Sequence, residues 1–267
     1  FLYFMKITGL LTKMLTENDS PIQYYMNFED GVFIVNQLLE KKVKINFNHY
    51  QCLGCGQDKE IFAMGYCKNC YFTSPLVGEW VVRPELSTAH LGKADRDLEV
   101  ESQAQLQPHI VYLANSGGIK VGVTRKSQIP TRWIDQGAEY AIKVAETENR
   151  YEAGLIEVAL KEHMADKTNY RKMLSENVPF EDLSNKKNEI MDFIPKDMQH
   201  FIVEDTQMLH LQYPIHAYPL KVNSVNLKKK PELEGVLIGI KGQYLMFDNN
   251  LVFNVRSHEG FVVDLEI

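Results

Sequence analysis

The chain has 267 residues, a formal net charge of −6 and 45% hydrophobic residues. This length allows two modest domains, and the acidic balance excludes polyanion binding by bulk charge, so any such surface must be a local patch. No apolar run reaches the roughly 20 residues that span a bilayer, and residues 1–25 lack the pattern of a secretory signal. We therefore expect a cytoplasmic protein without membrane contact, and Met5, preceded by Phe-Leu-Tyr-Phe, as its native start.

The first part of the chain reads as β structure. Up to Tyr50 apolar and polar residues alternate in short runs, as in the segment 43–47. A period of two is typical of half-buried strands. Residues 87–107 are polar and predict a loop or linker. We therefore expect a β-rich region at 5–105, with a domain boundary near residue 105.

All the cysteines of the chain lie within this region, as two CxxC pairs with eleven residues between them: Cys52, Cys55, Cys67 and Cys70. Four thiolates complete the tetrahedral coordination of Zn²⁺ and leave no position for water, so the spacing predicts a structural zinc knuckle at 52–70. Gly54, Gly56 and Gly65 stand where such turns need unusual backbone angles. An iron–sulfur cluster uses the same ligands and is the main alternative, beside two disulfides or four free thiols.

The central segment, 106–200, is predicted to form an αβ module. The apolar runs 109–114 and 119–124 flank a turn with two glycines, which predicts a hairpin. Helical spacing and end signals predict the helices that follow, at 131–137, 150–164 and 181–194.

The last part of the chain returns to β structure. Short apolar runs separated by turns predict strands at 235–240, 243–247 and 251–255. We expect the region 201–267 to pack with the N-terminal β region. The predicted fold class is therefore α+β, with a β-rich outer domain, a zinc knuckle and a central αβ module.

Five positions of the central segment stand in an order that resembles the GIY-YIG nuclease superfamily. In that fold two hairpin strands carry the name-giving motifs, a following helix carries an arginine, a later helix carries a metal-binding glutamate, and an asparagine lies downstream. The matching positions are Tyr112 and Gly122 in the hairpin, then Arg132, Glu157 and Asn169.

The residues of the two hairpin motifs allow a closer comparison. Lys-Val-Gly-Val-Thr at 120–124 is similar to the second motif of the phage-type branch, and Lys120 stands where the superfamily usually has tyrosine. Ile110 and Val111 replace the glycine and isoleucine of the first motif. The segments KVGVTR and RWIDQGA resemble, more closely still, an uncharacterised bacterial family over nearly the whole chain.

The resemblance implies a nucleic-acid binding or processing protein, in its sharpest form an endonuclease that cleaves DNA or RNA with Mg²⁺ or Mn²⁺. Glu157 would hold the metal, Arg132 would bind phosphate, and Tyr112 or Lys120 would position or deprotonate water. Asn169 would hydrogen-bond the site. Protein partners are not indicated.

The carboxylate assignment has one competitor. Glu152 also precedes a leucine–isoleucine pair, but Glu157 lies twelve residues before Asn169, as the superfamily spacing prefers.

Each position also has an ordinary interpretation. Tyr112 could be a core tyrosine, Glu157 a solvated helix residue, and Arg132 a cation stacked on Trp133. Two further functions stay open: a non-catalytic DNA- or RNA-binding module, and a nucleic-acid-modifying enzyme on the same scaffold. The aromatic residues near the cysteines are assigned to packing, and the lysine run 228–230 to a solvated loop.

Overall fold

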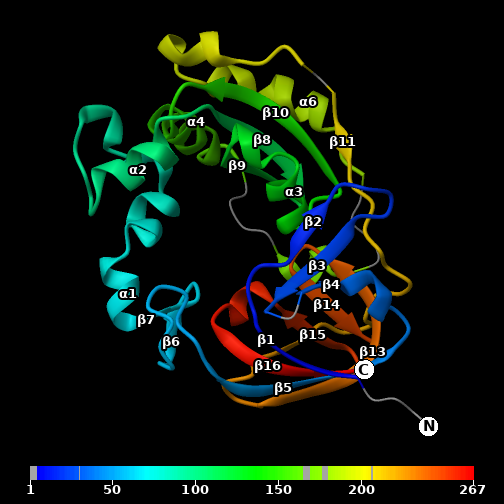
Figure 1. The fold of residues 1–267 in the computed structure, drawn as a ribbon. Helices are drawn as coiled ribbons and strands as arrows, with labels where there is room; N and C mark the ends of the chain where they lie inside the picture. The colour runs from blue at the N-terminus through cyan, green and yellow to red at the C-terminus, as the bar shows by residue number, and fades with distance from the viewer. Residues whose placement is uncertain (1–4, 30, 165–168, 176–179, 206) are drawn as a thin grey trace. The chain divides into compact units, whose positions relative to one another are not determined.

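The computed structural model describes residues 5–29, 31–164, 169–175, 180–205 and 207–267. It is a mixed α+β fold that divides into two compact units (Figure 1). Unit 1 comprises Phe1–Phe72, Leu174–Glu176 and Gln212–Ile267, and unit 2 comprises Thr73–Met173 and Asn177–Leu211. Within the described residues, no helix is both long and apolar enough to cross a bilayer.

Strands from both ends of the sequence share the main sheet of unit 1. The β12–β15 pair is parallel and every other neighbouring pair is antiparallel. In spatial order the sheet contains β1 (Lys6–Leu10), β16 (Phe261–Glu266), β5 (Lys42–Tyr50), β13 (Glu232–Lys241), β14 (Tyr244–Phe247), β15 (Leu251–Asn254) and β12 (Asn223–Val225).

The predicted strand at 43–47 lies inside β5 and shows why alternation is informative. Val43 and Ile45 are each 1% exposed, whereas Lys42 and Lys44 reach solvent and pair with glutamates of β13. One face of the strand therefore enters the core and the other carries charge.

Unit 1 also contains two smaller sheets and one short helix. The smaller sheets are β2 (Leu15–Glu17), β3 (Gln23–Phe28) and β4 (Gly31–Ile34), and the hairpin of β6 (Ile61–Ala63) and β7 (Tyr66–Cys67). Helix α1 (Lys68–Thr73) follows this hairpin directly, and the division between the units falls before its last residue.

The sheet of unit 2 contains the predicted hairpin. Its spatial order is β11 (Leu209–His210), β10 (Tyr140–Thr147), β8 (His109–Asn115) and β9 (Ile119–Arg125). Tyr112 of β8 lies directly opposite Gly122 of β9. The sequence-based prediction omits β10, which pairs with β8 and makes β8 a central strand.

Two helices of unit 2 pack on this sheet. Ile156 and Leu160 of α4 share one hydrophobic core with Val111 and Leu113 of β8 and with Leu183 of α6. The predicted helix 150–164 ends earlier, at Lys161, and the predicted helix 131–137 ends before Gly137, whose φ is +66°. The helices of unit 2 are α2 (Leu98–Gln105), α3 (Thr131–Asp135), α4 (Arg150–Lys161), α5 (Tyr170–Met173) and α6 (Leu183–Ile190).

The boundary between the units differs from the one predicted near residue 105. It falls after Phe72, and the polar segment 87–107 is folded rather than a linker. The buried carboxylate of Glu101 in α2 accepts hydrogen bonds from the backbone N–H groups of Asp95, Arg96 and Asp97, at 2.8, 2.7 and 3.0 Å. Polar composition suggested solvent exposure, but here the polar side chain satisfies backbone groups inside the unit.

Candidate metal centre and candidate active site

The cysteines of unit 1 come together at the β6–β7 hairpin. Cys52, Cys55, Cys67 and Cys70 are free thiols whose sulfur atoms all lie within 4.8 Å of one another. The backbone N–H groups of Gly54 and Cys67 donate to the Cys52 sulfur, at 3.4 and 3.2 Å. Four sulfurs this close can converge on one tetrahedral ion, so the cluster could hold a metal such as zinc.

The thiols of this cluster differ in acidity. Burial opposes ionisation of Cys52, but backbone N–H groups of Cys67, Cys55 and Gly54 outweigh it and lower its pKa to about 6. Burial and hydrogen bonds to the other three cysteines raise the pKa of Cys70 to about 12. Four thiolates in this space repel one another, and a divalent cation would supply the missing positive charge.

The three glycines of this segment act in two ways. Gly56 and Gly65 have φ of +68° and +80°, which confirms the predicted need for unusual angles. Met64 and Gly65 both have positive φ and form the two-residue turn of the hairpin. Gly54 is needed for space, because a Cβ there would lie 2.9 Å from the Cβ of Cys70.

In unit 2, the tyrosine of the hairpin occupies the space left by a glycine. Tyr112 is fully buried, and a Cβ on Gly122 would lie 2.7 Å from its hydroxyl oxygen. The hydroxyl donates to Oε1 of Gln136 at 2.8 Å, and Trp133 packs edge-on against the ring at 5.8 Å. Burial raises the pKa of Tyr112, against the charge and hydrogen bond of Arg132. The Tyr112 hydroxyl is thus held in its neutral, protonated form.

Glu157 lies on the buried face of α4, at helical spacing from Ala153, Ile156 and Leu160, and is 6% exposed. Its Oε1 is 3.4 Å from Nζ of Lys161, whereas its Oε2 has no hydrogen-bond partner in the described part of the chain. Burial raises the pKa of Glu157, and the positive charges of Lys161 and Arg150 oppose this. The interpretation of Glu157 as an ordinary solvated residue is therefore wrong.

Arg150 belongs to the same site, although it was not among the site residues predicted from the sequence. It donates from Nε to the carbonyl of Trp80 at 3.1 Å and from Nη2 to that of Val81 at 2.7 Å, and its guanidinium lies 5.6 Å from the Trp80 ring centre. Burial lowers its pKa to about 10, opposed by the charge of Glu157 and reinforced by that of Arg132. The sequence does contain a signal for Arg150: it stands seven residues before Glu157, and this spacing places both residues on one face of the helix.

Lys120 is another basic residue of this site, after Arg150, whose pKa is lowered. It lies on β9, where burial and the charge of Arg132 lower its pKa to about 8. A measurable share of this amine is therefore uncharged near neutral pH.

Four of the predicted catalytic residues are thus electrostatic neighbours. The charge of Arg132 lowers the pKa values of Tyr112, Lys120 and Arg150, and the charge of Glu157 raises those of Tyr112 and Arg150. We call Tyr112, Lys120, Arg132, Arg150, Glu157 and Lys161 the Glu157 cluster.

Asn169, the fifth predicted catalytic residue, is not among these electrostatic neighbours. It is exposed, and its Oδ1 accepts the backbone N–H groups of Arg171 at 3.1 Å and Lys172 at 3.4 Å. These are the contacts of a residue that caps the first turn of α5.

Glu152 has a structural role at the start of α4. Asn149 caps the helix by accepting the N–H of Glu152 at 3.1 Å, and the Glu152 carboxylate accepts the N–H of Glu148 at the same distance. Asn149 thus satisfies a free N–H group of the first turn of α4, and Glu152 holds the residue before the cap. Glu157 makes no comparable backbone contact among the described hydrogen bonds.

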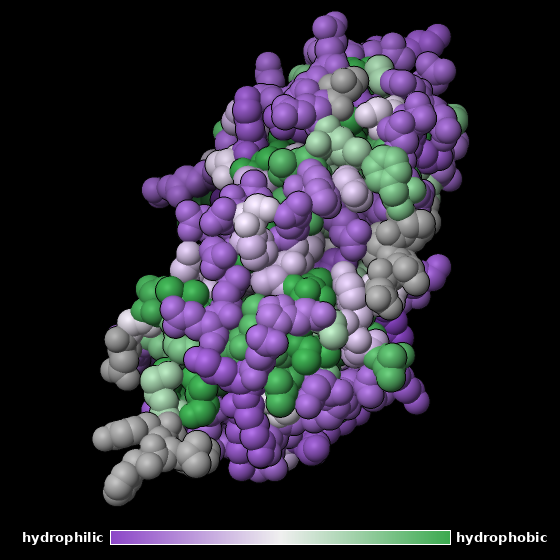
Figure 2. Space-filling model, turned by 90° about the vertical axis from the view of Figure 1, so that its right-hand side faces the viewer, coloured by the Kyte–Doolittle hydropathy of each residue, from purple (hydrophilic) through white to green (hydrophobic). Residues whose placement is uncertain are grey.

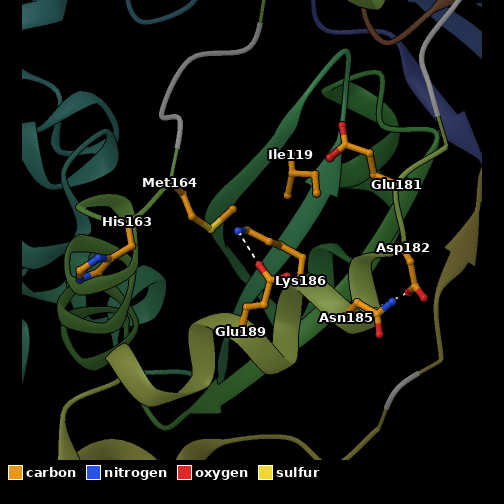
Figure 3. Close-up of a pocket in the computed structure, with 8 residues that line it drawn as sticks. All are labelled: Ile119, His163, Met164, Glu181, Asp182, Asn185, Lys186 and Glu189. Carbon is orange, nitrogen blue, oxygen red and sulfur yellow. Dashed lines mark hydrogen bonds and ion pairs between the residues drawn. The ribbon is translucent and has the colours of Figure 1, made fainter.

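A separate open pocket of about 600 Å³ lies beside α6 in unit 2 (Figure 3). Two of its three acidic side chains have local partners: Asp182 caps α6 through the N–H groups of Ser184 and Asn185, and Glu189 pairs with Lys186 at 2.8 Å. An acidic lining disfavours phosphate, and the Glu157 cluster is not part of it.

The chain was compared with known proteins. The model of a family described as protein of unknown function (DUF2797) matches residues 40–263, and the chain belongs to this family. No curated protein and no solved structure matches it. The matched range includes the cysteine cluster and the Glu157 cluster.

Proposed function

We propose that unit 2 is a GIY-YIG-like module that binds nucleic acid and cleaves phosphodiester bonds with a divalent metal. The order of its elements supports this: a hairpin that packs Tyr112 over Gly122, then Arg132 on α3, then Glu157 on α4.

One observation carries the proposal. Glu157 is a buried carboxylate with one oxygen left without a hydrogen-bond donor in the described structure, inside a cluster of basic side chains. An unpaired buried oxygen costs free energy, which a bound ligand would recover. A hard divalent cation fits this oxygen, with water and phosphate as its other ligands, and Mg²⁺ or Mn²⁺ would supply Lewis-acid stabilisation of phosphate charge.

The surrounding residues then have distinct roles. The planar fork of Arg132 binds a phosphate oxygen pair. Water attacks phosphorus while the uncharged amine of Lys120 accepts its proton, and the leaving oxygen departs with the electrons of its bond to phosphorus and takes a proton from solvent. The neutral hydroxyl of Tyr112 positions Arg132 through its hydrogen bonds to Arg132 and Gln136. Arg150 adds positive charge beside the carboxylate.

The cysteine cluster has a different role in this proposal. Zinc is its resident metal, held by Cys52, Cys55, Cys67 and Cys70, and it fixes the β6–β7 hairpin without taking part in cleavage.

A second candidate is nucleic-acid binding without cleavage. The contact of Lys161 with Oε1 of Glu157, at 3.4 Å, favours it, because an ion pair there competes with a metal for the carboxylate.

Purified protein incubated with labelled DNA and RNA, with Mg²⁺ or Mn²⁺, separates these candidates. We expect metal-dependent cleavage that Arg132→Ala lowers by a factor of about 100 or more. Binding without any cleavage would establish the second candidate instead. A folded protein that neither binds nor cleaves would contradict both.

A further inference from the structure

Three aromatic side chains gather on the surface of unit 1 beside the cysteine cluster. Phe62 on β6 lies 5.1 Å from Tyr71 and 5.6 Å from Phe72, both on α1, and these two are 5.2 Å apart between ring centres. Phe62 is 53% and Phe72 57% exposed. We call these residues the aromatic triad.

The triad does not serve the core. Ile61, one residue before Phe62, is 5% exposed and packs where a Cβ on Gly260 would lie 2.6 Å from it. Because side chains alternate along a strand, Phe62 is directed outward. Single apolar residues among polar ones are ordinary on a protein surface, but three rings in mutual contact form a patch. Figure 2 shows, for one face of the molecule, groups of hydrophobic residues among hydrophilic ones. The rings of the triad therefore pack against one another, and Phe62 and Phe72 also present exposed surface.

A loop of three lysines lies against the same hairpin. Nζ of Lys228 donates to the carbonyl of Ile61 at 2.7 Å and to Glu60 at 3.2 Å. The N–H groups of Lys229 and Lys230 both donate to the carbonyl of Asn226 at 3.0 Å, which fixes the turn. Their side chains are exposed. Lys228 offsets the charge of Glu60, and the exposed Lys229 and Lys230, the next two residues of the loop, add two further positive charges.

We infer that the aromatic triad and the lysine loop form one surface that binds unpaired bases of DNA or RNA. Exposed rings stack on bases of any sequence, and neighbouring lysines contact the phosphates between them. The positive loop favours a polyanion over an apolar protein segment as the occupant. This inference rests on the proposed function and gives its substrate class: nucleic acid with a single-stranded part.

Fluorescence anisotropy of the full chain with labelled 12-nucleotide dT and rU strands and a 12-base-pair duplex tests this surface. We expect tighter binding of the single strands, weakened about tenfold by Phe62→Ala combined with Phe72→Ala. Lys229→Ala combined with Lys230→Ala should reduce the salt dependence of binding. Val32→Ala and Lys41→Ala, at exposed positions elsewhere in unit 1, are the matched controls.

Metal content and melting temperature, measured for each variant, show that the hairpin is intact. Single-strand binding unchanged in both combined variants, or equal affinity for duplex, would overturn the inference. So would absence of oligonucleotide binding by the wild type, which would leave the triad to a protein partner. Wild-type cleavage with strand binding that both combined variants leave unchanged would overturn this inference alone. Strand binding that depends on the triad, without any cleavage, would overturn the proposed cleavage alone, so the two failures are distinguishable.

Discussion

The cysteine cluster and the Glu157 cluster are assembled in opposite ways. The four cysteines lie within 19 consecutive residues, and a hairpin with one two-residue turn brings them together. The Glu157 cluster draws on β8, β9, α3 and α4, and Arg150 is held by carbonyl groups 69 and 70 residues earlier in the chain. The first centre depends on local structure, and the second depends on the complete fold of unit 2.

This difference has a consequence for stability. A closed set of four thiolates binds metal with free energy that counts directly toward folding. A buried carboxylate with one oxygen unpaired costs free energy. Substitutions at the first centre should therefore destabilise, and substitution of Glu157 should not.

The largest effect is expected from Cys52→Ser. Cys52 is buried and accepts two backbone hydrogen bonds, so its loss removes both a metal ligand and the centre of the knuckle. We expect loss of bound metal and of several kcal/mol of unfolding free energy, measured by elemental analysis and thermal unfolding. The wild type should contain one zinc per chain. A coloured, iron-containing protein, or a variant that keeps its metal and its melting temperature, would contradict this.

The contrast between the two centres also explains what could be predicted from sequence. The cysteine spacing, the hairpin and the glycine that follows α3, Gly137, are local signals, and the structure shows four clustered cysteines, the hairpin and a helix that ends shortly before this glycine. The hydrogen bond from Arg150 to Trp80 could not be predicted, because the segment 73–86 folds into short 3₁₀ helices that leave no periodic pattern in the sequence. The close packing of this segment on α4 appears only in the folded structure, where a Cβ on Gly154 would lie 2.3 Å from the backbone N atom of Glu85.

Gly122→Ala is the next largest test. The added methyl group would meet the hydroxyl of the fully buried Tyr112 at 2.7 Å. We expect a loss of about 2 kcal/mol in unfolding free energy, measured by denaturant titration. Unchanged stability would show that Tyr112 does not occupy this space.

Glu157→Gln should stabilise the protein, in a pH-dependent way. Because burial raises the pKa of Glu157 in the folded state, the folded protein holds this proton more tightly than the unfolded chain. The carboxylate then lowers stability as pH rises above the range of an ordinary glutamate, about 4.3. We expect the variant to be more stable by about 1 kcal/mol at pH 8 and equal to wild type below pH 4. Lower stability at pH 8 would show that the ion pair with Lys161 dominates.

The smallest effect is expected from Asn169→Ala. Since Asn169 only caps α5 and is exposed, we expect a loss of at most about 1 kcal/mol and cleavage within about threefold of wild type. A 100-fold loss of cleavage in a folded variant would return Asn169 to the catalytic residues.

The central claim, that Glu157 is the metal-binding carboxylate of a nuclease, is tested most directly by two variants of one helix. Glu152→Gln keeps an oxygen for the N–H of Glu148, whereas Glu157→Gln removes the buried charge. Cleavage rates of a labelled single-stranded substrate, with saturating Mn²⁺, should be near wild type for Glu152→Gln and lower by a factor of 100 or more for Glu157→Gln. Equal rates for the two variants would contradict the assignment of the site.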